Sequence, residues 1–150
     1  HQAKKSCAKT VASIFVNPAQ FAPHEDFDRY PRDLKSDKQK IAASGVDLIF
    51  APPVAEVYPA EFATRIEVGG PSVGLETDFR PHFFAGVATI VSKLLIAAMP
   101  DHAILGEKHY KQLLVIRRLV ADLGLPNEIA GVELITLADG LTSRSITSYL

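Results

Sequence analysis

Apolar runs alternate along the chain with longer segments in which apolar residues recur at helical spacing. The runs predict strands at residues 10–16, 47–52, 65–68, 102–106 and 128–132. A helix is predicted at residues 32–45, between Pro31 and the stop signal at Gly45. Two amphipathic helices are indicated by apolar positions, which are Phe84, Val87, Val91, Leu94 and Ala98 in the first and Leu113, Ile116, Val120 and Leu123 in the second. The alternation predicts an α/β fold with a mostly parallel sheet and helices on both faces.

The composition indicates one domain without a charged binding surface. The 150 residues are 47% hydrophobic, which is enough for a buried core, and no linker or repeat divides them. We therefore expect a single domain over residues 1–150. The formal net charge is -1, from 16 basic and 17 acidic residues scattered along the chain, so we expect no nucleic-acid partner.

Signals for export, membrane insertion and metal binding are weak in this sequence. Cys7 is the single cysteine, and no apolar stretch has the length of a secretory or membrane-spanning segment. We therefore expect a cytoplasmic protein with no membrane partner. The five histidines lack the close pairing and the cysteine partners of zinc sites, so no metal site is predicted.

Polar residues gather where three of the predicted strands end, in the segments FVNPAQF, LGEKHY and LADGLTSRSITSYL. Ligands of parallel sheets bind outside the carboxyl ends of the strands. In the first segment, the neutral amides of Asn17 and Gln20 could bind the hydroxyl and carboxylate of a small polar substrate, in a loop that Pro18 stiffens. The same two residues could instead only cap the turn, since Asn is common before Pro.

Lys108 follows the second strand end, in the first turn of a helix predicted to begin directly after Gly106. A cation at a helix N-terminus is unfavourable unless an anion lies beside it, so Lys108 and the free backbone N–H groups are candidate phosphate ligands. Gly106 would let that ligand approach the backbone closely. The alternative is a solvated surface turn in which Glu107 neutralises Lys108.

Two other segments allow both a functional and an ordinary interpretation. Arg80 could hold a carboxylate or phosphate through two hydrogen bonds, or it could form a local ion pair with Glu76. The segment 143–148, which contains Arg144 and Ser145, could bind phosphate through its hydroxyls or form a polar loop.

Taken in order, the segments SIFVNPAQF, YPR, VDLIFAP, YP, LE with RP, FAGVATIVSKLL, GEK with YKQL, and ADGL with YL resemble the pantothenate synthetase family. The resemblance runs from Ala3 to Leu150. It implies a Rossmann-like domain related to the nucleotidyltransferases and class I aminoacyl-tRNA synthetases. It also implies that pantoate reacts with ATP to give pantoyl adenylate and pyrophosphate, and that β-alanine then displaces AMP. Mg²⁺ and a homodimer are implied as well.

Site residues of the family carry over to matching positions of this chain. The resemblance implies that Asn17, Gln20 and Gln112 contact pantoate and that Lys108 is the catalytic, phosphate-binding lysine. It further implies nucleotide-binding positions at Gly106, Lys108, Val132 and Ser145, with Glu76, Arg80 and His109 as possible additions.

The chain departs from the family pattern at several positions. His109 stands where the family usually has Asp, Phe83 where it has His, and Ile146 where it has Arg. The family segment PTMGxLHxGH and the small C-terminal domain have no counterpart here, so we expect a sheet that is incomplete at the N-terminus. Two alternatives stay open. The chain could be a non-catalytic remnant that binds a small carboxylate or nucleotide, or it could be a nucleotidyltransferase that acts on another hydroxy acid.

Overall fold

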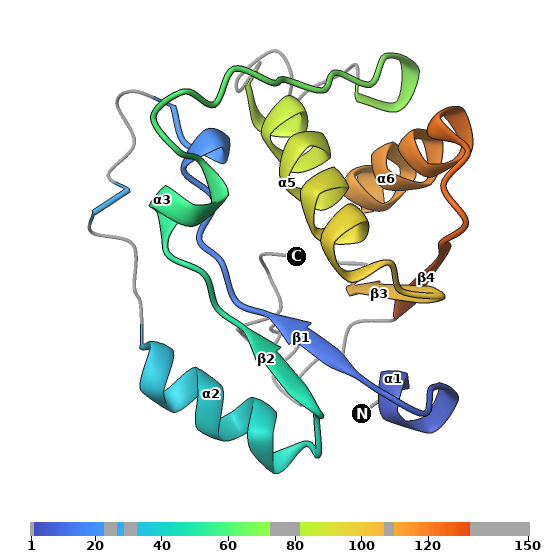
Figure 1. The fold of residues 1–150 in the computed structure, drawn as a ribbon. Helices are drawn as coiled ribbons and strands as arrows, with labels where there is room; N and C mark the ends of the chain where they lie inside the picture. Colours follow the sequence, from blue (N-terminus) through green and yellow to red (C-terminus); the bar gives the residue numbers. More distant parts are fainter. Residues whose placement is uncertain (1, 23–26, 29–32, 73–81, 107–109, 133–150) are drawn as a thin grey trace, which may run out of the picture.

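The computed structural model describes residues 2–22, 27–28, 33–72, 82–106 and 110–132. Its elements, in chain order, are α1 (Gln2–Ser6), β1 (Val11–Ser13), the 3₁₀ helix η1 (Pro18–Gln20), α2 (Leu34–Ala43), β2 (Leu48–Phe50), α3 (Val54–Val57), the 3₁₀ helix η2 (Gly70–Ser72), α5 (Phe83–Ala98), β3 (His102–Gly106), α6 (Tyr110–Leu123) and β4 (Glu128–Val132). Helices and strands alternate along most of this order, as Figure 1 shows.

The four strands form two parallel pairs. β1 pairs with β2, with Val11 opposite Leu48, and β3 pairs with β4, starting at His102 opposite Glu128. The prediction of an α/β fold with parallel strands is confirmed. The expected single sheet is replaced by two two-stranded sheets, because no backbone ladder joins the two pairs within the described residues.

Helices α5 and α6 pack against each other and supply most of the core (Figure 1). Val87 on α5 and Ile116 on α6 are completely buried. Three further core residues are Phe15, which follows β1, Val57 at the end of α3, and Leu105 in β3. Both amphipathic helices expected from the apolar spacing are therefore confirmed. No helix in the described part of the chain is both long and apolar enough to cross a membrane.

Helix α2 contacts β2 and lies well away from α5 and α6 (Figure 1). Its first turn is capped by Asp33, whose carboxylate accepts a hydrogen bond from the Ser36 N–H at 3.0 Å. The chain leaves the helix through Gly45, which has a φ of +77° that favours glycine. The predicted helix at residues 32–45 is confirmed with a later start, at Leu34.

The start of β2 is joined to the start of β1 by the carboxylate of Asp47. It accepts hydrogen bonds from the Lys4 Nζ at 3.0 Å, the Thr10 backbone N–H at 2.9 Å and the Thr10 hydroxyl at 3.0 Å. The Lys9 Nζ lies 3.4 Å away on the same group. The hydrogen bonds from Lys4 and Thr10 hold the pKa of Asp47 well below its usual range.

The strand predicted at residues 65–68 is wrong. The backbone N–H of Ile66 donates to the Thr89 hydroxyl on α5 at 3.0 Å, so the segment is hydrogen-bonded to a helix side chain instead of a neighbouring strand. The strands predicted at residues 10–16 and 47–52 are shorter in the structure, ending at Ser13 and Phe50. The two strands predicted at residues 102–106 and 128–132 have the predicted bounds.

Candidate functional site

Asn17 lies just beyond the carboxyl end of β1 and is 4% exposed. Its Nδ2 donates to the Gln20 Oε1 and to the Gly86 carbonyl, each at 3.0 Å. Its Oδ1 accepts from the Ala19 N–H at 3.2 Å and from the Tyr58 hydroxyl at 2.8 Å. The amide therefore makes all four of its hydrogen bonds within the chain. This network caps η1, as one interpretation of the sequence predicted, and it also fixes Gln20.

Backbone groups set the direction in which both side-chain amides point. The Ala19 N–H can only donate and the Gly86 carbonyl can only accept, so the Oδ1 and Nδ2 of Asn17 cannot exchange places without losing both bonds. Because Nδ2 is a donor, it selects the oxygen of the Gln20 amide. The Nε2 amino group of Gln20, a donor, is then the end that a ligand could contact.

Gly86 brings the first turn of α5 into direct contact with the loop after β1. A Cβ added at Gly86 would lie 2.6 Å from the Ala19 carbonyl oxygen and 3.1 Å from the Gln20 backbone nitrogen. No larger residue fits between two backbones at such distances. The small residue therefore allows the helix to support η1 and accept the Asn17 hydrogen bond at the same point.

The carboxyl ends of β3 and β4 lie side by side, because Gly106 and Val132 are opposite each other in the strand register. The sequence placed both residues at the nucleotide site, and the structure brings them together. Gly106 is exposed, and a Cβ added there would meet no atom within 4 Å. Gln112 is buried in the first turn of α6, next to the core residue Leu113, and six described helices and strands separate α6 from η1 in the chain.

Several predicted site residues lie outside the described part of the chain, and these are Glu76, Arg80, Lys108, His109 and Ser145. The predicted helix start next to Lys108 also lies outside it, since α6 is described from Tyr110. The structure therefore brings together Asn17 with Gln20, and Gly106 with Val132.

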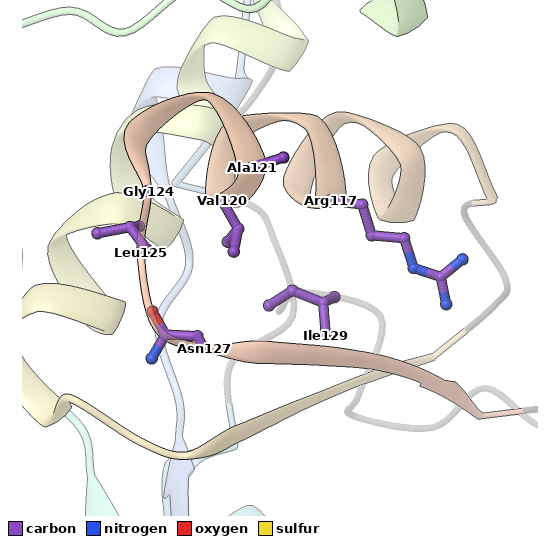
Figure 2. Close-up of a pocket in the computed structure, with 7 residues that line it drawn as sticks. All are labelled: Arg117, Val120, Ala121, Gly124, Leu125, Asn127 and Ile129. Carbon is purple, nitrogen blue, oxygen red and sulfur yellow. The ribbon is translucent and has the colours of Figure 1, made fainter.

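A cavity of about 450 Å³ adjoins η1 on the side of Pro18 and Ala19. Tyr58, Phe62 and Gly86 also line this cavity. A second pocket of about 450 Å³ lies between the end of α6 and the start of β4, where Figure 2 shows the side chains of Val120 and Ile129 facing the same space. This second pocket is at the amino end of β4, whereas Val132 is at the opposite end of that strand.

Sequence reasoning missed two residues of the amide network, Tyr58 and Gly86. Tyr58 belongs to the segment YP of the family resemblance, but its contact with Asn17 gave no signal, because the two residues are 41 positions apart in the chain. Gly86 did offer a sequence signal, since a glycine inside an otherwise apolar helix usually has a packing reason.

Solved structures share this fold closely. The structure of pantothenate synthetase from Thermus thermophilus superposes with a TM-score of 0.91 at 50% identity, covering 94% of this chain and 51% of that one. The pantoate-beta-alanine ligase from Francisella tularensis, solved with beta-gamma ATP and beta-alanine, gives a TM-score of 0.89 at 36% identity, covering 94% of this chain and 54% of that one. The chain is therefore an α/β protein of the nucleotidyltransferase-like class.

The family follows from the sequence comparison. Residues 1–150 match the family described as Pantoate-beta-alanine ligase, and the chain belongs to this family. Pantothenate synthetase from Mesorhizobium japonicum is 55% identical over 148 residues, which cover 99% of this chain and 52% of the relative. The enzyme from Thermus thermophilus is 49% identical over 150 residues, covering 54% of its length. The chain spans about half the length of the curated relatives it matches.

Proposed function

We propose that the protein containing this chain joins pantoate to β-alanine with the conversion of ATP to AMP and pyrophosphate. The observation that carries the proposal is the hydrogen-bonded amide pair of Asn17 and Gln20 beyond the carboxyl end of β1, in a chain that belongs to the pantoate-beta-alanine ligase family. The pair directs the Gln20 amino group outward as a donor, which suits the carboxylate and hydroxyl oxygens of pantoate.

The proposed site residues fall into two groups. Gln20 and Gln112 contact pantoate, with Asn17 completing that pocket. Gly106 and Val132 lie at the nucleotide site, and their opposition in the β3–β4 register supports this assignment. Residues outside the described part complete the proposal, with Lys108 as the catalytic, phosphate-binding residue, Ser145 at the nucleotide, and Glu76, Arg80 and His109 as further candidates.

The proposed chemistry has two balanced steps. A carboxylate oxygen of pantoate attacks the α-phosphorus of ATP, and the bond to the β-phosphate oxygen breaks, which releases pyrophosphate. The amine of β-alanine then attacks the acyl carbon, AMP leaves with the oxygen of the broken acyl–phosphate bond, and the amine loses a proton. In the first step, the Lys108 ammonium would stabilise the charge that develops on the phosphates. Pantoate needs no general base there, because its carboxylate is already a nucleophile.

Mg²⁺ is proposed only as the ion that accompanies the triphosphate. The described residues contain no group of three or more His, Cys, Asp or Glu side chains that could hold a metal ion. Bound Mg²⁺ would supply charge neutralisation on the phosphate oxygens.

Self-association and location are part of the same proposal. We infer a homodimer, because the family resemblance implies one, and a cytoplasmic location, which was the expectation from the sequence pattern. Sedimentation of the purified protein would test the dimer.

Pyrophosphate release tests the proposed function. The protein is incubated with ATP, Mg²⁺ and pantoate, with and without β-alanine, beside a Lys108→Ala variant. We expect release that requires pantoate and falls by about 100-fold or more in the variant, the scale of losing an electrostatic stabiliser of the transition state. If folded wild-type protein binds pantoate without releasing pyrophosphate, the chain is a non-catalytic binding protein. Equal release with another hydroxy acid would assign a different substrate.

A further inference from the structure

Tyr58 lies at the carboxyl end of α3 and connects that helix to the loop after β1. Its hydroxyl donates to the Asn17 Oδ1 at 2.8 Å across 41 residues of sequence. Burial raises the pKa of Tyr58 to about 12, so the hydroxyl keeps the proton that it donates at neutral pH. The bond is one of the four that hold Asn17, and it is the one that comes from a side chain on another helix segment.

The ring of Tyr58 is held on several sides, so its hydroxyl reaches a defined position. The Phe62 ring packs edge-on at 5.0 Å between centroids, and the Phe15 ring lies at 6.1 Å. Lys93 on α5 has its Nζ 4.4 Å from the Phe62 ring centroid and 5.7 Å from that of Tyr58. The same Nζ donates to the Val57 carbonyl at the end of α3. These contacts join α3 to α5 beneath the tyrosine.

We propose that Tyr58 is a positioning residue for the pantoate site, acting through Asn17 on the side chain of Gln20. This inference rests on the proposed function. Asn17 is held by hydrogen bonds to the Gly86 carbonyl and from the Tyr58 hydroxyl, and its Nδ2 also donates to the Gln20 oxygen. Without the Tyr58 hydroxyl, η1 keeps its contact with α5 but loses its hydrogen bond to the α3 segment. Gln20 then spends less time in the orientation that directs its amino group at the ligand.

The test is the Tyr58→Phe variant of the protein that contains this chain, because the substitution removes the hydroxyl and keeps the ring packing. Steady-state kinetics should show the KM for pantoate raised about two- to tenfold, the range for one lost hydrogen bond, with the KM for ATP unchanged. Ser92→Ala is the matched control, since it also removes one buried hydroxyl, whose hydrogen bond to the Ala88 carbonyl lies within α5. The control should leave both KM values unchanged.

A mutant cycle with Gln20→Ala separates positioning from a general structural role. If Tyr58 acts through Gln20, the double variant Gln20→Ala with Tyr58→Phe should have the same pantoate KM as the Gln20→Ala variant alone. Independent, multiplicative effects would overturn the inference, and so would an unchanged pantoate KM in Tyr58→Phe or a parallel rise in both KM values. Wild-type protein without pantoate-dependent turnover would remove the proposed function itself, an outcome visible before any variant is measured.

Discussion

Substitution of Gly86 by alanine tests the close contact between α5 and the loop that carries Gln20. The new methyl group would lie 2.6 Å from the Ala19 carbonyl oxygen and 2.8 Å from its carbon. Both obstacles are backbone atoms, which cannot rotate away as a side chain can. The loop must therefore move off the helix, and this movement also lengthens the hydrogen bond from Asn17 to the Gly86 carbonyl.

Two opposing contributions set the size of the effect. Alanine favours a helix over glycine by about 1 kcal/mol, which would stabilise α5. Forcing an extra carbon into a closely packed contact costs about 1–3 kcal/mol, and contact with rigid backbone puts this site in the upper part of that range. The expected net loss of unfolding free energy is about 1–2 kcal/mol, or a Tm lower by about 2–8 °C for a domain of this size.

Thermal unfolding of Gly86→Ala and of a Gly69→Ala control measures this balance. An added Cβ at Gly69 meets no atom within 4 Å, so the control should stay within about 0.5 kcal/mol of wild type. The pantoate KM of Gly86→Ala should also rise, because the Gln20 backbone nitrogen would be 3.1 Å from the new carbon. A Gly86→Ala protein as stable as wild type, or more stable, would refute the reasoning, since only helix propensity would then be at work.

Two further predictions concern stability. Asp47→Asn should destabilise the protein at pH 7, and the difference in unfolding free energy from wild type should shrink as the pH falls below about 4. The pKa of the carboxylate is depressed in the folded state, so its contribution to stability is present above the unfolded-state pKa and is lost when the group is protonated. Denaturant unfolding at pH 7 and below about pH 4 measures this, and a difference that stays constant would contradict it. Ile116→Ala, at a completely buried position of α6, should cost about 2–5 kcal/mol, whereas Leu123→Ala, at a residue 54% exposed at the end of that helix, should cost much less in the same assay. Equal losses would contradict the burial of Ile116 in the core.

The strongest periodic patterns in the sequence predicted the fold best. The apolar spacing of α5 and α6 located both helices, since a helix that covers a core must repeat its apolar positions every three or four residues. The segment at Arg65 to Val68 has strand-like residues but no strand beside it, and only tertiary structure shows that Ile66 bonds to Thr89. Pairing partners far away in sequence leave no local pattern, and for this reason the β1–β2 register and the Tyr58 contact were not predictable.

The site was predictable in its residue types and less so in their division of roles. The family resemblance implied Gly106 and Val132 as nucleotide-binding positions, and the β3–β4 register puts them opposite each other. Asn17 and Gln20 were expected to face a ligand as equals. In the structure, Asn17 makes its four hydrogen bonds inside the protein, so Gln20 is the better placed of the two to contact a substrate.

The network around Asn17 explains why the strand β1 is followed by uncharged polar residues. The position faces one carbonyl oxygen and one backbone N–H, from Gly86 and Ala19, and needs a donor and an acceptor on the same side chain. Aspartate would oppose the Gly86 carbonyl with a second acceptor and bury a charge, and leucine would leave both backbone groups unpaired. An amide satisfies them and still has one donor for the Gln20 oxygen and one acceptor for the Tyr58 hydroxyl. The requirement for asparagine therefore comes from the protein interior, and it determines that Gln20 offers a donor to its ligand, the polarity that the acceptor oxygens of the proposed substrate require.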